Sequence, residues 1–356
     1  MIVHVLQRRS VRAAIAALGL AAAIVLLIWR GPSFQSFVDA FVAVRWRWVV
    51  VAIALNLASV VARALAWRTV IGQAMPPPPP RFQLVFSAFS VGLFANAVLP
   101  GRIGELARVA VLTRRLPAEQ RSGAWATLVG TVFAHRVFDL LPTLLLILYV
   151  LLTARIPGWA ITSLEAVVGV GVTVLAVAMI GARRQYRPAT EGVGAVKRVI
   201  TMARAGLSVM HTPTAAATAA AFQCIGWICQ LLAVYTAMRA FHIHSPLPAA
   251  GLVLLLMNVA TIFPLWPGNV GLVQAAIALP LVGYGIAYAH GVAYGFGLQA
   301  IEASVGIGVG LLFLAREGLS FGMVRVMPDA SQAELPERTS DAEQQERERA
   351  GARISG

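Results

Sequence analysis

Lysine and acidic side chains are both scarce in this chain. Lys197 is the only lysine among 29 basic residues, and eight of the 15 acidic residues follow position 316, which leaves seven before it. Charged residues make up 12% of the sequence, about half the share of an ordinary soluble domain. So little charge cannot cover a water-exposed surface, which excludes a conventional soluble protein.

Several signatures of catalysis are also missing. The sequence has no GxxxxGK[ST] loop, no metal-ligand spacing and no nucleophile elbow. Cys224 and Cys229 are five residues apart in one apolar run, so they point in different directions from a helix and indicate neither a disulfide nor a metal site. We therefore expect no ATP motor, no enzymatic activity, no cofactor and no metal.

Apolar residues dominate instead. They make up 58% of the chain, the mean hydropathy is +0.76, and several runs reach the roughly 20 residues that cross a bilayer. Six runs predict full membrane spans: Arg12–Trp29, Trp48–Ile71, Ser122–Thr153, Ala160–Gly181, Pro213–Phe241 and Ala287–Arg316. Arg63 and Arg68 lie near the far end of the second span, where long side chains can snorkel to the surface.

The pattern PGxxG occurs twice inside the apolar region, as Pro100–Gly104 and Pro267–Gly271. Proline and glycine end helices, and a broken helix is costly in lipid unless it lines a cavity enclosed by protein. The patterns divide Phe82–Leu112 and Pro248–Val282 into pairs of short helices. The predicted fold is therefore an all-α polytopic membrane protein with six full spans and two re-entrant helical hairpins, eight hydrophobic segments in all.

The placement of arginine predicts the orientation. Basic residues gather in short loops, so the net charge of +14 follows the positive-inside rule and does not indicate a nucleic-acid partner. The rule places both termini in the cytoplasm, so the first hairpin enters from the cytoplasm and the second from outside. The halves then form inverted repeats, a common design of secondary transporters. We expect a transmembrane domain over residues 1–316 and a disordered cytoplasmic tail over 317–356.

The first PGxxG pattern opens a charged helix. Arg102, Glu105 and Arg108 are three residues apart, so they share one face. The helix N-terminus presents free N–H groups, and Gly101 and Gly104 let the backbone approach a ligand closely. Together these features predict an anion site suited to phosphate. The alternative is a helix cap at the water boundary with a local ion pair.

A second charged pair lies in the middle of the third span. Arg136 and Asp139 are three residues apart, and each would be costly alone in hydrocarbon. Either they form a structural ion pair that holds helices together, or Arg136 shares its guanidinium between Asp139 and a lipid headgroup. His135 beside them is more typical of a hydrogen-bonded packing residue.

The second PGxxG pattern is polar where the first is charged. Asn269 and Gln274 stand where the first carries Arg102 and Glu105, and Gly268 and Gly271 match the two glycines of the first. Asn96 precedes the first break, where its amide can satisfy backbone groups that the break frees. Glu302, with Gln299 three residues before it, predicts a polar contact between helices.

The stretch from Asn96 to Arg108 resembles the signature of the lysylphosphatidylglycerol synthase transmembrane region family, the flippase-like domain proteins. The stretches Arg63–Arg68, Arg136–Asp139 and Pro264–Gly271 agree with it. The resemblance implies a bacterial cytoplasmic membrane protein that translocates lipid. His135 and Gln274 stand where acidic residues are usual in the family. About forty tail residues cannot form the family's aminoacyl-transferase domain, so lysyl transfer is not expected.

These features predict a lipid flippase or lipid exporter. An anionic phospholipid, glycolipid or polyprenyl-phosphate headgroup would lie between the two broken helices while its tails stay in lipid. The alternative is a non-transporting membrane partner that presents lipid to a separate glycosyl- or acyltransferase. An intramembrane enzyme is a third interpretation, but no nucleophile or metal set accompanies the charged residues.

Overall fold

The computed structural model describes residues 34–98, 103–121, 124–156, 158–183, 212–261 and 269–316, and the regular elements in these ranges are all helices. The first expected span and the tail 317–356 lie outside the described residues, as do Pro100, Gly101, Arg102, Pro267 and Gly268.

Four of the described helices are long and apolar enough to cross a membrane. They are α4 (Trp46–Ala74), α8 (Ala124–Thr153), α11 (Pro213–Ala240) and α14 (Tyr288–Arg316). Each begins and ends close to the span that the sequence predicts. A rise of about 1.5 Å per residue makes each about 40–45 Å long, which exceeds the ~30 Å hydrocarbon core. The chain is thus an integral multi-pass membrane protein.

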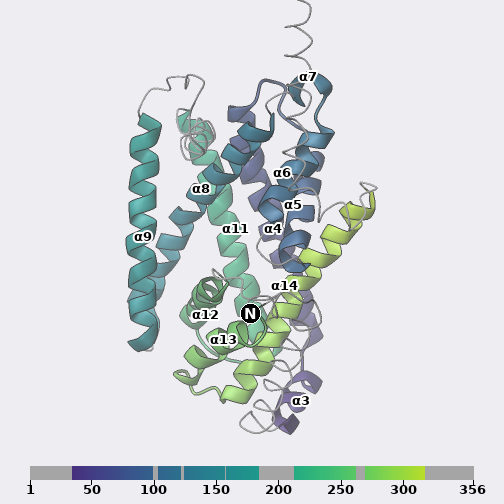
Figure 1. Ribbon diagram of the computed structural model, residues 1–356. Coiled ribbons are helices and arrows are strands. Elements are labelled where there is room, and N and C mark those ends of the chain that lie inside the picture. The colour runs from purple at the N-terminus through teal and green to yellow at the C-terminus, as the bar shows by residue number, and fades with distance from the viewer. Residues whose placement is uncertain are drawn as a thin grey trace, which may run out of the picture.

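Shorter helices surround these four. Helix α9 (Gly158–Arg183) packs against α8 at one side of the bundle, while α3 (Phe34–Val42) and α7 (Ala118–Arg121) lie toward opposite ends of it (Figure 1). In α3, Phe41 packs edge-on against Phe241, with ring centroids 5.4 Å apart. This contact attaches the short helix to the C-terminal end of α11.

The two predicted hairpins are present as pairs of short helices. In the first, α5 (Phe82–Val98) packs against α6 (Gly104–Arg115), and in the second, α12 (Leu247–Ala260) packs against α13 (Leu272–Val282). In both, the helix ends before its PGxxG pattern and a new helix begins within it or directly after it. Each hairpin is therefore broken near its PGxxG pattern, although α12 already ends at Ala260, well before Pro267.

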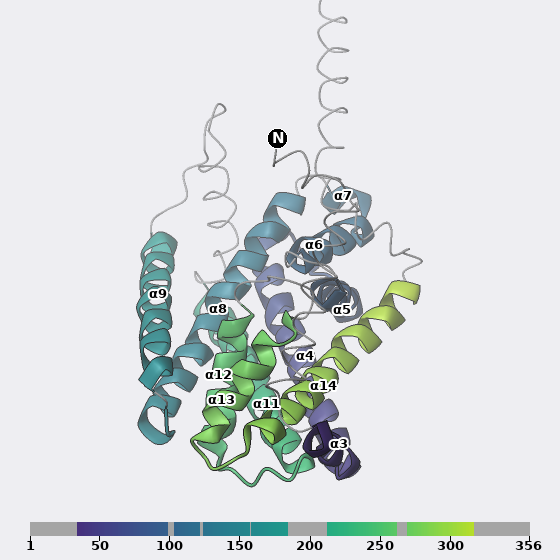
Figure 2. The same ribbon diagram turned by 60° about the horizontal axis from the view of Figure 1, so that its bottom comes forward.

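The two hairpins are attached at opposite ends of the bundle: the first where α5 begins and the second where α13 ends (Figures 1 and 2). Near the start of α8, Gln120 Nε2 donates to Pro78 O, 3.4 Å away, which places the entry to α5 beside α7. Beyond the end of α8, the Arg155 N–H donates to Tyr284 Oη, 2.8 Å away, just past α13. One hairpin is therefore anchored at the start of α8 and the other at its end.

Helix α14 holds both hairpins, because it packs against α5 and against α13. Close approach depends on glycine: a Cβ at Gly291 would lie 2.9 Å from Ala278 Cα, and one at Gly310 would lie 2.9 Å from Ser90 O. Two large apolar clusters fill the bundle, one around α12 and one around α5 and α6. The cavity described below lies beside the second cluster.

The tight contact within the first hairpin gives a stability prediction. A Cβ at Gly104 would collide with Gly92 O and lie 2.6 Å from the Asn96 side chain, whereas a Cβ at Gly308 would meet open space. Gly104→Ala should lower the free energy of unfolding in micelles by about 1–3 kcal/mol because the helices must separate. Gly308→Ala is the matched control and should be neutral or slightly stabilising. Equal stability of both variants would contradict the close packing of α5 on α6.

Candidate functional site

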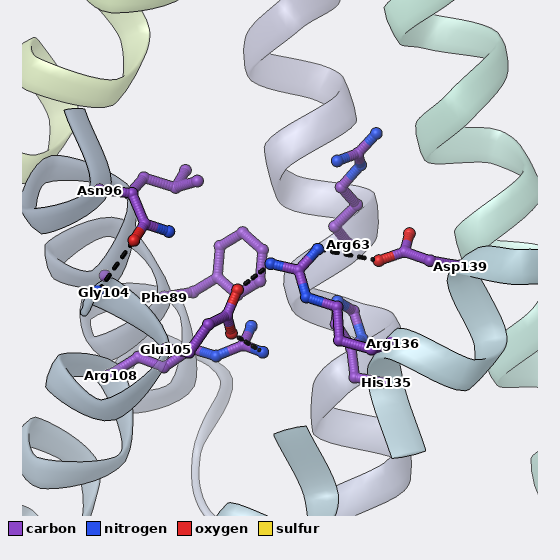
Figure 3. Close-up of a pocket in the computed structure, with 11 residues that line it drawn as sticks. Arg63, Phe89, Asn96, Gly104, Glu105, Arg108, His135, Arg136 and Asp139 are labelled. Carbon is purple, nitrogen blue, oxygen red and sulfur yellow. Dashed lines mark hydrogen bonds and ion pairs between the residues drawn. The ribbon is translucent and has the colours of Figure 1, made fainter. Parts of the chain in front are cut away.

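A cavity of about 50 Å³ lies between α4, α5, α6 and α8, a volume that exceeds several-fold the ~10–15 Å³ needed by one water. Its charged side chains come from α4, α6 and α8 (Figure 3). Its lining residues are Arg63, Phe89, Gly92, Leu93, Asn96, Gly104, Glu105, Arg108, His135, Arg136 and Asp139. The cavity is therefore polar although the bundle around it is apolar.

Glu105 is held between two arginines. Its Oε2 lies 2.5 Å from Arg108 Nη2, an ion pair that lacks the geometry of a hydrogen bond. Its Oε1 accepts a hydrogen bond from Arg136 Nη2 on the neighbouring helix. The carboxylate thus joins α6 to α8 and occupies a position between two cations (Figure 3).

Arg108 is buried deeply for a charged residue. Only 3% of its surface is exposed, and its guanidinium carbon lies 4.6 Å from the Trp67 ring centroid and 5.3 Å from that of Phe89. The faces of these rings stabilise the cation, but they accept no hydrogen bonds from the N–H groups at the edge of the guanidinium. Arg108 Nε and Nη2 are buried with no hydrogen-bond partner among the described residues. A buried donor without a partner costs about 1–3 kcal/mol, so the cavity favours a ligand that accepts from Arg108.

Asp139 anchors the charged cluster to the rest of the bundle. Its Oδ2 accepts from Arg136 Nη1 at 3.2 Å, and its Oδ1 accepts from Gln223 Nε2 at 2.5 Å and Trp227 Nε1 at 3.0 Å. The last two donors belong to α11. Ion pairs of Glu105, Arg136 and Asp139 therefore connect α6 to α8, and the hydrogen bonds of Asp139 connect α8 to α11.

The N–H groups at both helix breaks find partners inside the protein. Asn96 Oδ1 accepts from the Gly104 N–H at 2.8 Å, and Gln274 Oε1 accepts from the Gly271 N–H at 2.6 Å. Asn269 Nδ2 donates to Ala260 O at 3.0 Å, which satisfies a carbonyl at the end of α12. These two N–H groups are therefore not free to bind a ligand.

The structure brings only some of the sequence-predicted residues together. The cavity contains Asn96, Gly104, Glu105, Arg108, Arg136 and Asp139. Asn269, Gly271 and Gln274 belong to the second hairpin and do not line this cavity; Gln274 Nε2 instead donates to Gln299 Oε1 on α14 at 2.5 Å. Gly101, Arg102 and Gly268, with the prolines Pro100 and Pro267, lie outside the described residues.

Sequence reasoning missed Arg63 and the aromatic walls. Arg63 lines the cavity and its guanidinium carbon lies 5.3 Å from the Trp227 ring centroid, so it does not extend to the membrane surface as predicted. The cost of a charge inside an apolar span was the signal that could have found it. His135 also faces the cavity: its ring packs edge-on against Phe89, and its Nδ1 has no partner among the described residues.

The anchoring role of Asp139 gives a second prediction. Asp139→Ala should lower the free energy of unfolding by about 2–4 kcal/mol, because it leaves the donors of Gln223 and Trp227 and the charge of Arg136 without an acceptor. Arg136→Ala should cost about 1 kcal/mol or less, since half of that side chain (53%) is exposed to solvent. Denaturation in mixed micelles measures both values. A larger loss for Arg136→Ala would show that Asp139 is not the anchor.

Comparison with known proteins identifies a family. No curated protein and no solved structure matches the chain. The lysylphosphatidylglycerol synthase TM region family matches residues 14–310, which contain every helix of the cavity and both hairpins. A match over most of the chain shows that this protein belongs to the lysylphosphatidylglycerol synthase TM region family.

Proposed function

We propose that the protein moves lipids with anionic phosphate headgroups across a membrane, as a flippase or exporter. The observation that carries the proposal is the buried guanidinium of Arg108, which faces a polar cavity. Its Nε has no hydrogen-bond partner among the described residues, and its Nη2 has only the ion pair with Glu105. Arginine N–H groups match phosphate oxygens in geometry and charge. The family to which the chain belongs is membrane- and lipid-related, in keeping with a lipid as the ligand.

The charge of the cavity supports an anion as the ligand. Its described lining holds three cations, Arg63, Arg108 and Arg136, against two carboxylates, Glu105 and Asp139. With histidine counted as neutral, these lining residues carry a net charge of +1. An uncompensated charge is costly in a low-dielectric interior. A phosphodiester carries one negative charge and would neutralise it.

Glu105 occupies the position that a phosphate would take. Its two oxygens face Arg108 and Arg136, as two phosphate oxygens would. An arriving headgroup can replace this carboxylate at both arginines, and the carboxylate can return when the headgroup leaves. Such an exchange keeps the arginines paired throughout, which lowers the barrier to binding and to release. The cavity would thus bind lipid reversibly.

The arrangement of the hairpins supports transport rather than static binding. The hairpins are anchored at opposite ends of α8 and both pack against α14. We propose that they are inverted repeats, within a fold of six full spans and two re-entrant hairpins with both termini in the cytoplasm. In this orientation the exposed Arg114 and Arg115 face the cytoplasm. Each hairpin would then open the cavity to one side of the membrane in turn.

A liposome assay tests the function. Purified protein is reconstituted in phosphatidylcholine vesicles that contain acyl-labelled NBD-phosphatidylglycerol, and dithionite measures how fast the label in the inner leaflet becomes accessible. Arg108→Gln should slow movement about tenfold to a hundredfold, the effect of losing a hydrogen bond to a charged ligand. Arg114→Gln is the matched control, because Arg114 is exposed on the same helix. Its rate should equal that of the wild type.

The same assay separates transport from lipid presentation to a separate transferase. Wild-type protein that retains phosphatidylglycerol through purification but does not move it in vesicles would favour the lipid-presenting partner. Equal rates for wild type and Arg108→Gln would refute the role assigned to the cavity.

Removal of the competing carboxylate gives an independent prediction. Glu105→Gln raises the positive charge of the cavity by one and keeps the size of the side chain. Native mass spectrometry should show about tenfold or greater retention of phosphatidylglycerol by Glu105→Gln, because lipid no longer displaces a charged group. Glu119→Gln, on α7, is the control and should retain as much lipid as the wild type. Weaker retention by Glu105→Gln would mean that this carboxylate holds the site in shape and does not compete for it.

A further inference from the structure

One face of α11 carries polar groups through the middle of the bundle. Gln223, Trp227 and Gln230 are separated by four and three residues, so they form one stripe on the helix. Gln223 and Trp227 bind Asp139 of α8, and Gln230 Nε2 donates to Glu302 Oε1 of α14 at 2.7 Å. Polar side chains are uncommon inside a membrane bundle and often mark functional positions.

The stripe continues from the first hairpin to the second. Gln299 lies one turn before Glu302 on α14 and accepts from Gln274 Nε2, and Gln274 in turn accepts from the Gly271 N–H at the start of α13. At the other end, Asp139 binds Arg136, which binds Glu105 of α6. Polar side chains therefore follow one another from the restart of one broken helix to the restart of the other, joined partly by hydrogen bonds and partly by their positions on α11 and α14.

Arg63 lies at the centre of this stripe. Its guanidinium stacks on Trp227 and is within electrostatic reach of both Asp139 and Glu302. Within the described ranges no carboxylate is close enough to form an ion pair with Arg63, and its buried Nε has no hydrogen-bond partner. Gly226 makes room for it, because a Cβ there would lie 3.0 Å from Arg63 Cγ. The protein thus holds an unpaired cation midway along a polar stripe.

We propose that Arg63 is a second phosphate-binding position, to which a lipid headgroup passes from Arg108 along the polar face of α11 toward the second hairpin. This inference rests on the proposed function and adds the route. A guanidinium stacked on an aromatic ring keeps its edge free, so Arg63 can bind phosphate oxygens while Trp227 holds its plane. The side-chain amides of Gln230, Gln299 and Gln274 are neutral donors. Each could release its present partner and donate to a passing phosphate, so they would form a path for an anion.

The test uses the vesicle assay with increasing mole fractions of NBD-phosphatidylglycerol, which yields a maximal rate and a half-saturating fraction. Arg63→Gln should lower the maximal rate about tenfold or more, because the second position is lost. The half-saturating fraction should stay unchanged, because loading at Arg108 is intact. Arg63→Lys keeps the charge but loses the planar guanidinium, so it should recover part of the rate. Arg68→Gln, on the same helix, is the matched control and should behave as the wild type.

A second variant tests the same position without removing its charge. Gly226→Ala places a methyl group against Arg63 Cγ and shifts that side chain along α11. It should lower the maximal rate severalfold and leave the half-saturating fraction unchanged. Elution as a single peak in size-exclusion chromatography shows that each variant is folded. If Arg63→Gln does not fold, Gly226→Ala and Arg63→Lys decide the outcome.

Two results would overturn the inference, and they are distinct. If the wild type moves lipid, Arg108→Gln does not, and Arg63→Gln equals the wild type, then Arg63 is not on the route although the cavity functions as proposed. If Arg63→Gln and Arg63→Lys change both kinetic parameters equally, then Arg63 only holds α4 against α11. Vesicles in which the wild type moves no lipid would instead refute the proposed function itself.

Discussion

The cost of burying charge in an apolar bundle governs this structure. Three arginines and two carboxylates converge between four helices. They are tolerable there because each carboxylate is paired with arginine and two of the arginines stack on aromatic rings. Glu105 joins α6 to α8, and Asp139 joins α8 to α11. The broken hairpin is therefore attached to the long helices by charge as well as by packing. Contacts of this kind can be exchanged for a charged ligand, whereas apolar packing cannot.

The same constraint explains how the helix breaks are built. A break frees backbone N–H groups that lipid cannot satisfy. Asn96 accepts one at the first break, and Gln274 accepts one at the second, where Asn269 also satisfies a freed carbonyl. Arg63, Arg108 and Arg136 are the cations in the described lining of the cavity. In the proposed function they would hold the ligand by side chains that can move, which suits release.

The sequence predicted most of the architecture, for reasons that are clear. Long apolar runs and two PGxxG patterns leave few alternatives in a membrane, so α4, α8, α11 and α14 and both hairpins appear near the expected residues. The family resemblance carried by Asn96–Arg108 is confirmed by the match over residues 14–310. The sequence also placed Glu105 beside Arg108 and Arg136 beside Asp139, because spacing on one helix is local information. It could not show that Glu105 meets Arg136, or that Arg63 turns inward to Trp227, since those contacts depend on how separate helices pack.

The most direct measurement is an experimental structure of the wild-type protein in nanodiscs that contain phosphatidylglycerol. The account predicts a lipid phosphate within hydrogen-bonding distance of Arg108, with the Glu105 carboxylate displaced from that arginine and the acyl chains extending between helices into the bilayer. Lipid bound only at the outer surface of the bundle, with Glu105 still paired to Arg108 and Arg136, would contradict the account.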